Sequence, residues 1–139
     1  MKVLLDTNII LDVILQRIPF FTSAIEILKL SELGEIQSYI SSNSISDIFY
    51  VIRKYFDDVN DRKAAVKHIL GIVDIVSVTK TDIYKSVELE FTDFEDALQT
   101  QCAKKIKANY IITKNKKDFK GVTVNVITPE LFLKEIAGN

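Results

Sequence analysis

The amino-acid sequence predicts a three-layer α/β/α domain with a mainly parallel central sheet of about five strands. Short runs rich in apolar and β-branched residues alternate with longer stretches of helical spacing, which is the pattern of an α/β domain. Most of the short runs are apolar throughout, as in strands that helices cover on both faces. No linker rich in Pro, Gly or Ser and no internal repeat divides the chain, so we expect residues 1–139 to form a single domain.

The expected elements follow from period and composition. Strands are expected at residues 2–5, 36–40, 75–78, 110–113 and 123–127. Helices are expected at residues 9–16, 21–33, 46–56, 62–73, 83–90, 94–107 and 130–136. Because helices separate most of the strands along the chain, the sheet is expected to be mainly parallel.

Several helix ends carry their own signal. Residues 128–130, Thr-Pro-Glu, supply an N-cap, a proline at the first helical position and an acid in the first turn. Thr92 and Glu95 match a capping box, in which each side chain binds the backbone amide of the other residue. Gly34 stands where the second helix needs a C-cap. These signals support the bounds given above.

The composition is that of a compact soluble domain. Hydrophobic residues make up 47% of the chain and charged residues 27%, with only 4 Gly and 2 Pro. The single cysteine, Cys102, cannot form an internal disulfide and is expected to be a buried small apolar residue. The opening apolar run stops at Asp6, far short of a membrane span, and no leader segment is seen. We therefore expect a cytoplasmic protein without membrane association.

The charge balance makes no general case for nucleic-acid binding. The formal net charge is -1, whereas chains that bind phosphates non-specifically usually carry a basic excess. Attraction to RNA or DNA would therefore have to be local. The one compact basic stretch contains Lys114, Lys116, Lys117 and Lys120.

The candidate functional residues are acids that stand near the ends of expected strands. Asp6 follows the first strand directly, Asp118 follows the fourth, and Asp93 and Asp96 open the helix before the fourth strand. Ligands of a parallel sheet collect at the carboxyl ends of its strands. Carboxylates gathered there repel one another unless a hard cation such as Mg²⁺ or Mn²⁺ lies among their oxygens. If these acids meet, they predict a divalent-metal site.

Each of these acids also has a purely structural interpretation. Asp6 can cap the helix that begins near Asn8. Asp47 lies three residues after Ser44 and can be the acidic half of a capping box. The two acids at the start of the sixth helix can be first-turn residues that favour the helix dipole, and Asp118 can be a turn residue.

The other acids considered have no comparable placement. They are interpreted as solvated surface charge: Asp12, Glu26, Glu32, Glu35, Asp57, Asp58, Asp61, Asp74, Asp82, Glu88 and Glu135. His68, the only histidine, lies in a helical pattern of apolar and basic residues, which favours a surface or partly buried role over catalysis. The chain offers no convincing Ser/His/Asp or Cys/His set.

Three segments resemble the motifs of the PIN domain family, in the same order and with similar spacing. The opening "MKVLLDTNIILD" resembles the first motif, "DFEDALQ" the third and "YIITKNKKDF" the fourth. The resemblance runs over nearly the whole chain and implies a PIN-like fold. The second motif departs from the family, because "SSNSISDIFYVI" offers Asp47 where family members often have Glu.

The resemblance implies roles for individual residues. Asp6, Asp93, Asp96 and Asp118 would be catalytic acids that ligate the metal, and Asp47 would be a further catalytic acid that acts through a water. Polar side chains would hold these carboxylates and their waters in place: Asn8, Thr113 and Asn115.

The function that the resemblance implies is hydrolysis of phosphodiester bonds in single-stranded or structured RNA, dependent on Mg²⁺ or Mn²⁺. Small prokaryotic members of the family commonly serve as toxins that a cognate antitoxin protein neutralises. The basic stretch beside the fourth acid would contact substrate phosphates, through Lys114, Lys116 and Lys117.

Two other families that begin with a strand and an acid fit less well. A phosphatase of the haloacid dehalogenase type requires a second Asp where this chain has Asn8. A receiver domain, which is a Mg²⁺-binding signalling module, requires a phosphorylatable Asp at the end of a central strand, and neither residues 40–43 nor 76–79 supply one. The remaining alternative is a PIN-like module that has lost catalysis and binds RNA or protein, because Asp47 replaces the usual Glu.

The expected third helix is rich in aromatic residues, with Phe49, Tyr50, Tyr55 and Phe56. This is more bulk than one buried face requires. The sequence therefore predicts a homodimer or partner surface here.

Overall fold

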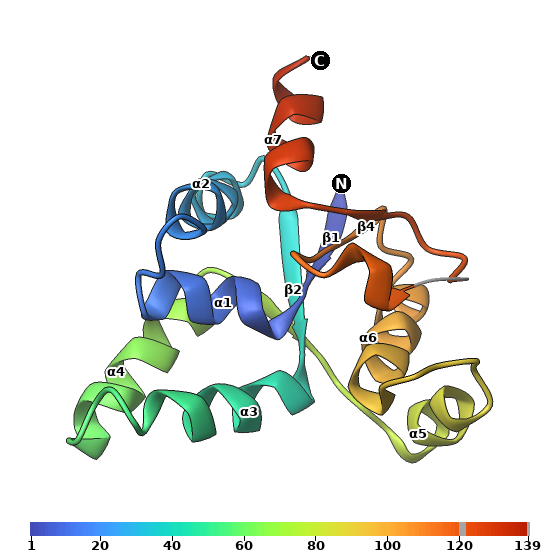
Figure 1. Cartoon of the computed structure of the whole chain (residues 1–139), viewed down its shortest axis with the longest axis horizontal. Helices are drawn as coiled ribbons and strands as arrows, with labels where there is room; N and C mark the ends of the chain where they lie inside the picture. The colour runs from blue at the N-terminus through green and yellow to red at the C-terminus, as the bar shows by residue number, and fades with distance from the viewer. Residues whose placement is uncertain (120–121, 139) are drawn as a thin grey trace.

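The computed structural model describes residues 1–119 and 122–138 and contains one parallel sheet (Figure 1). Over these residues the sheet has five strands in the order β3-β2-β1-β4-β5, and each neighbouring pair is parallel. The strands are β1 (Lys2–Leu5), β2 (Gln37–Ser41), β3 (Asp74–Val76), β4 (Tyr110–Ile112) and β5 (Val126–Ile127). The predicted parallel sheet is confirmed, although β5 is shorter than the expected strand at residues 123–127.

Helices cover both faces of the sheet. They are α1 (Thr7–Ile14), α2 (Phe21–Glu32), α3 (Ser42–Ile52), α4 (Val59–Leu70), α5 (Lys80–Val87), α6 (Phe94–Lys105) and α7 (Pro129–Ala137), with a short 3-10 helix, η1 (Lys116–Phe119). Figure 1 shows α1 to α4 on one side of the strands and α5 with α6 on the other. The predicted three-layer α/β/α fold is confirmed.

Alternation along β1 divides the core between the two faces. Val3 and Leu5 pack into the larger apolar cluster, which draws on α1 to α4 and α7. Leu4 points to the other face and packs with Cys102 and Ile111. All three β1 side chains are fully buried, and burial of such a side chain stabilises a fold by about 1.5–3 kcal/mol. The apolar role predicted for Cys102 is confirmed, since its side chain is fully buried.

The strand order reverses at β1, which lies between β2 and β4. The chain builds β2 and β3 on one side of β1 and then crosses over to build β4 and β5 on the other side. The carboxyl ends of β1 and β4 are joined where the Asp6 amide donates to the Ile112 carbonyl at 3.0 Å. Such a reversal in a parallel sheet opens a crevice that typically holds the ligand. Asp6 stands at this point.

Two of the predicted helix ends are confirmed. Gly34 has a φ of 77°, a left-handed conformation that glycine adopts without steric cost. Its amide donates to the Ser31 carbonyl at 3.0 Å, and the Glu35 amide donates to the Leu30 carbonyl at 2.9 Å, which together make a Schellman motif. At α7, the Thr128 side chain caps the helix and Pro129 takes the first position.

The capping box predicted for Thr92 and Glu95 is wrong, and the structural interpretation of Asp47 as part of a capping box also does not hold, because an earlier or neighbouring residue caps each helix. In α3 the Ser41 hydroxyl accepts from the Asn43 amide at 3.2 Å, so Ser44 and Asp47 lie inside the helix. In α6 the Asp93 carboxylate accepts from the Glu95 amide at 2.8 Å, so Thr92 is not the cap. The Glu95 side chain therefore takes no part in a capping box at the start of α6.

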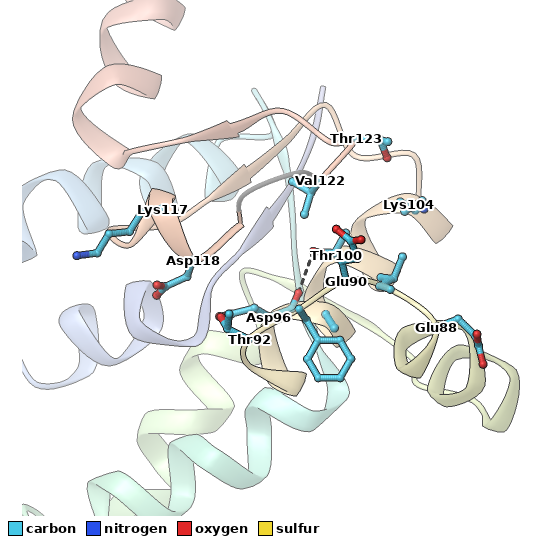
Figure 2. A pocket seen from close by; sticks show the side chains of 13 residues that line it. Glu88, Glu90, Thr92, Asp96, Thr100, Lys104, Lys117, Asp118, Val122 and Thr123 are labelled. Atoms are coloured by element: carbon cyan, nitrogen blue, oxygen red, sulfur yellow. Dashed lines mark hydrogen bonds between the residues drawn. The ribbon is translucent and has the colours of Figure 1, made fainter.

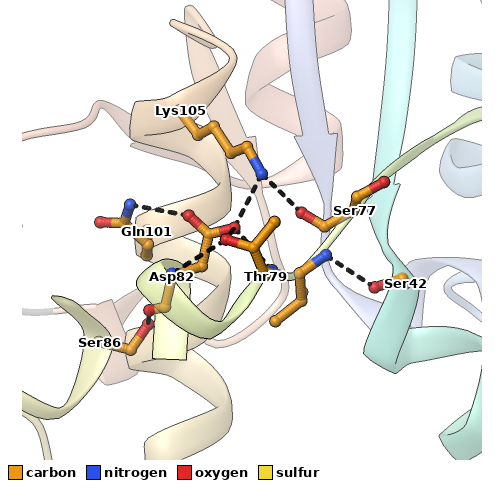
Figure 3. A network of polar contacts seen from close by, with 8 residues as sticks. Ser42, Ser77, Thr79, Asp82, Ser86, Gln101 and Lys105 are labelled. Atoms are coloured by element: carbon orange, nitrogen blue, oxygen red, sulfur yellow. Dashed lines mark hydrogen bonds and ion pairs between the residues drawn. The ribbon is translucent and has the colours of Figure 1, made fainter. Parts of the chain in front are cut away.

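Two acids that the sequence analysis assigned to solvated surface are buried. Asp12 is 1% exposed and lies 2.9 Å from the Lys114 ammonium and 3.5 Å from the Arg17 guanidinium. Asp82 is 4% exposed and pairs with Lys105 at 2.8 Å, as Figure 3 shows. The prediction fails for both mainly because a lysine distant in sequence pairs with each acid, and for Asp82 also because it forms a capping box with Thr79 at the start of α5. His68 is exposed, in line with the surface role expected for it.

None of the helices in the described part of the chain is long and apolar enough to span a bilayer.

Candidate metal and catalytic site

Asp6 directs its carboxylate toward α6 and β4 and does not cap α1. It occupies the N-cap position of α1, but its side chain accepts no hydrogen bond from the helix amides. One oxygen, Oδ2, accepts from the Thr113 hydroxyl at 2.7 Å, and the other, Oδ1, accepts from the side-chain amide of Gln99 at 3.2 Å. Asp6 is 6% exposed. This hydrogen bond from Thr113 to Asp6 supports the role expected for Thr113, which is to hold the carboxylate in place.

The start of α6 brings three acids to the same region. Asp93 is the N-cap residue, and Glu95 and Asp96 occupy the first turn. The Glu95 carboxylate accepts from the Thr7 hydroxyl of α1 at 3.2 Å and from Gln99 at 3.4 Å. Glu95 therefore reaches across to the element that follows Asp6.

Glu95 and Gln99 are residues of this region that sequence reasoning missed. Glu95 was assigned to a capping box that does not form. The available signal was their spacing of four residues, which places a carboxylate and an amide together on one face of a helix. Only the fold reveals that this face is turned toward Asp6.

The pKa of Asp96 is raised both by burial and by the acids that lie near it. Partial burial, followed by the nearby charges of Asp93, Asp6, Asp118 and Glu95, raises the pKa of Asp96 to about 7. Each of these charges disfavours ionisation of its neighbour. Acids from the end of β1, the start of α6 and η1 therefore act on one another electrostatically.

Asp47 also lies within electrostatic reach of the group. Burial and then the negative charge of Asp47 raise the pKa of Glu95, with Asp6 and Asp93 as smaller causes. Asp47 itself is exposed on α3, one helical turn after Ser44. The Ser44 hydroxyl hydrogen bonds to that of Thr7 at 2.7 Å, which ties the start of α3 to the start of α1.

The segment after β4 folds back on Thr113. The Asn115 amide donates to the Thr113 hydroxyl at 3.0 Å, and the Asp118 amide donates to the Asn115 carbonyl at 3.0 Å. Asp118 and Asn115 are exposed, and Asn8 is half-buried near the start of α1. The Thr113 hydroxyl thus makes two hydrogen bonds. It donates one to Asp6, which orients that carboxylate, and it accepts one from the Asn115 amide, which holds the segment that leads to Asp118.

The lysines of the basic stretch differ in what they contact. Lys114 is engaged within the protein, because its ammonium pairs with Asp12 and lies 3.8 Å from the centre of the Phe20 ring. Lys116 and Lys117 are exposed in η1. Lys120 lies outside the described residues. Lys116 and Lys117 therefore present their ammonium groups to solvent, whereas Lys114 does not.

The donor set fits a hard divalent cation. Within residues 1–119 and 122–138, no three Asp, Glu, His or Cys side chains are already close enough to enclose a metal ion. The donors that converge are nevertheless all oxygens, and their mutual repulsion is the feature that a cation would relieve. The side-chain carbonyl of Gln99, beside Asp6, is also buried without a hydrogen-bond partner.

A pocket of about 550 Å³ opens beside these acids. Figure 2 shows Asp96 and Thr100 of α6 together with Lys117 and Asp118 of η1 among its lining residues. The remaining lining comes mainly from the connection between α5 and α6. Of the acids of the site, Asp96 and Asp118 therefore line a concave surface that is accessible to a ligand.

The fold and the acidic crevice define a recognised class of protein. A family model described as PIN domain matches residues 2–117, and the chain belongs to this family. The resemblance inferred from the sequence motifs is confirmed. A search of curated protein sequences finds no match.

Solved structures with the same fold include bacterial toxins. The structure of VapBC-1 from nontypeable Haemophilus influenzae matches with a TM-score of 0.70 and 16% identity, over 94% of this chain and 99% of that one. A toxin-antitoxin complex from Klebsiella pneumoniae matches with a TM-score of 0.67 and 24% identity, over 91% of this chain and 97% of that one. VapC20 of Mycobacterium tuberculosis, a toxin that cleaves the sarcin-ricin loop, matches with a TM-score of 0.61 and 13% identity, over 78% and 86%.

Proposed function

We propose that residues 1–139 act as a single metal-dependent endoribonuclease domain. The observation that carries this proposal is that acids from separate elements meet at α6: Asp6 hydrogen bonds to Gln99 of α6, and Asp96 of α6 lines the same pocket as Asp118 of η1. A set of mutually repelling carboxylates is costly to a fold unless it serves a ligand. Membership of the PIN domain family supports hydrolysis of phosphodiester bonds as the use of this set.

Asp6, Asp93, Asp96 and Asp118 are the proposed ligands of Mg²⁺ or Mn²⁺. When bound, the cation supplies Lewis acidity, which acidifies water and neutralises charge on phosphate oxygens. Thr113 and Gln99 fix the orientation of Asp6 through the hydrogen bonds described above. We add Glu95 to the proposed site, and we keep Asp47 as an outer acid that acts through water.

The protein's own cations are proposed to bind the rest of the substrate. Lys116 and Lys117 lie in η1 beside Asp118 and are exposed, so they can contact phosphates that flank the scissile bond. Asn8 and Asn115 are proposed to hold waters near the acids. RNA is the proposed substrate, a choice supported by the VapC20 toxin of the same fold, which cleaves the sarcin-ricin loop.

The decisive test measures cleavage of single-stranded and hairpin RNA with Mn²⁺, with Mg²⁺ and with EDTA. We expect cleavage only with a metal, and a loss of more than roughly 100-fold in Asp6→Asn and Asp96→Asn, because these changes remove ligand charge with little change in shape. Glu35→Gln, on the exposed surface, is the matched control. RNA binding that needs no metal and leads to no cleavage would instead identify an inactive binding module.

We also propose that the protein is a toxin with a cognate antitoxin partner. The proposal is supported by the toxin-antitoxin complexes among the structures of the same fold. Expression of the wild-type chain should arrest bacterial growth, and Asp6→Asn should relieve the arrest. Growth that continues at equal levels of soluble wild-type protein would count against the toxin role.

A homodimer remains a proposal on the aromatic surface of α3. Tyr50 and Tyr55 are each 62% exposed, and the Arg53 guanidinium lies 4.1 Å from the centre of the Tyr50 ring. The surface is smaller than the sequence predicts, because Phe49 and Phe56 pack against the core. Light scattering that gives a strict monomer at micromolar concentration would exclude the homodimer.

A further inference from the structure

The pocket beside the acids extends well beyond them. Asp96 and Asp118 occupy one side, as Figure 2 shows, while Glu88 and Lys104 lie on the side of α5 and the distal part of α6. Part of its lining is apolar and comes from four residues: Leu89, Phe91, Ala97 and Val122. Cation ligation uses none of these apolar residues. The pocket therefore offers an apolar surface next to the acids, which a ligand with an apolar part can contact.

Phe91 is the aromatic side chain that lines the pocket. Its ring is 44% exposed and packs edge-to-face on Phe94, with ring centres 5.7 Å apart and an interplanar angle of 69°. This contact restricts the ring's orientation without burying it. A partly exposed aromatic ring of fixed orientation is a surface on which a planar ring can stack.

The charged groups on the lining indicate which part of a nucleotide each side of the pocket can bind. Glu88 and Glu90 contribute carboxylates, against the single lysine Lys104 on that side of the pocket. Carboxylates repel phosphate but accept hydrogen bonds from the amino groups of nucleobases. Lys117 stands on the other side, next to Asp118. The lining therefore suits a base beside Phe91 and, where a bound cation neutralises Asp96 and Asp118, a phosphate on their side of the pocket.

We propose that this pocket binds one nucleobase of the RNA substrate, stacked on Phe91, and favours a base that carries an amino group. The proposal rests on the proposed ribonuclease function for the identity of the substrate. The base occupies the space between the α5–α6 connection and η1, and its neighbouring phosphate lies toward Asp96 and Asp118. This pocket gives the enzyme a preference for the base beside the cut.

Base binding can be measured without cleavage, because the chain contains no tryptophan. Phe91→Trp places the single tryptophan of the chain on the pocket wall, and Tyr84→Trp places it at an exposed aromatic position of α5 that does not line the pocket. Each variant is titrated in EDTA with cytidine, uridine and ribose. We expect saturable quenching of Phe91→Trp by cytidine, weaker quenching by uridine and none by ribose. Equal responses of the two variants to cytidine would overturn the proposal.

Cleavage kinetics provide the second measurement. Phe91→Ala should raise KM for RNA roughly 5- to 150-fold, the range expected for the loss of one stacked base, and should weaken the base preference. Tyr84→Ala is the matched control and should change neither. Wild-type KM and base preference in Phe91→Ala would refute the pocket while the nuclease stands. Specific quenching in a protein that cleaves no RNA would refute the nuclease while the pocket stands.

Discussion

Asp96 makes the stability of the metal-free protein depend on pH. Its pKa in the fold, about 7, lies above the ordinary value of 3.8, so the folded protein holds this proton more tightly than the unfolded chain does. The free energy of unfolding therefore falls as pH rises from the ordinary carboxyl range through 7. Below that range both states are protonated and Asp96 has no such effect.

We predict that Asp96→Asn stabilises the metal-free protein at pH 8. The amide keeps the size of the side chain and removes the charge that its acidic neighbours repel. Thermal unfolding in EDTA should show a higher Tm for the variant than for the wild type at pH 8, and a much smaller difference at pH 4. Glu35→Gln should show no comparable gain. An unchanged or lower Tm at pH 8 would mean that the acids do not repel one another as described.

The pKa of Asp82 is shifted in the opposite direction to that of Asp96, so its effect on stability also changes with pH in the opposite direction. Hydrogen bonds from the Lys105 ammonium and then from the Thr79 amide lower the pKa of Asp82 well below the ordinary value. Figure 3 shows Lys105 reaching both Asp82 and the Ser77 carbonyl, which links α6 to α5 and to the segment after β3. The stabilisation by this carboxylate is present above its ordinary pKa and is lost as pH falls below it.

Asp82→Asn is therefore predicted to lower the free energy of unfolding by about 1.5–3 kcal/mol at pH 7, the range for hydrogen bonds to a charged group. The difference should shrink at pH 3, because the carboxyl of the unfolded chain is then mostly protonated while the folded one, with its lowered pKa, is still ionised. Urea unfolding at both pH values measures this. Asp74→Asn, at an exposed position, serves as the control. A loss of equal size at both pH values would indicate a change of packing and not of charge.

The ion pair between Lys114 and Asp12 connects two elements that are distant in sequence. The two residues are 102 positions apart, and the pair holds the segment between β4 and η1 against α1. Asp12 is 1% exposed, so its charge depends on Lys114 and on the more distant Arg17. This segment leads directly into η1, which carries Asp118, and the contact thus helps to position a proposed metal ligand.

Lys114→Met should lower the free energy of unfolding by roughly 2–4 kcal/mol, because it leaves a buried carboxylate with one weaker partner. It should also weaken Mn²⁺ binding, since the segment with Asp118 loses an anchor. Urea unfolding and Mn²⁺ titration test the two effects. Lys117→Met, at an exposed position in the same region, should leave stability nearly unchanged. If both variants have wild-type stability, the ion pair does not anchor the segment.

Most elements could be predicted from the sequence, because apolar period and β-branched content act locally. Helix starts were less predictable. The stretch before α3 offers Ser41, Ser42 and Ser44 as possible caps, and local preference does not distinguish between them. At α6, Thr92 and Asp93 compete in the same way. In the fold, Ser41 and Asp93 are the residues with extended backbone at which these helices begin, and their side chains provide the caps.

The gathering of the acids was predictable only in part. Asp6 and Asp118 follow strands that the fold places side by side, so their proximity follows from parallel topology and from the motifs. Glu95 could not be assigned in this way, because its contact with Thr7 spans 88 positions. The burial of Asp12 and Asp82 likewise depends on long-range pairing with lysines. Local sequence reveals charge, whereas the complete fold decides which charges meet.

Metal binding should stabilise the whole molecule, because the acids that it draws together belong to β1, α6 and η1. A ligand that binds only the folded state adds about 2.7 kcal/mol at a concentration of 100 times its Kd. For a domain of this size, that corresponds to a rise in Tm of roughly 5–15 °C. We predict such a rise with saturating Mn²⁺, and its reversal on removal of the metal with EDTA.

The size of this rise should increase with pH. At pH 6 the proton on Asp96 competes with the cation, whereas at pH 8 the carboxylate is ionised and the repulsion that a cation relieves is largest. Thermal unfolding with and without Mn²⁺ at both pH values measures the difference, and Asp96→Asn should remove most of its pH dependence. A Tm that does not respond to Mn²⁺ at either pH would show that the converging acids do not form a metal site, whatever activity the protein has.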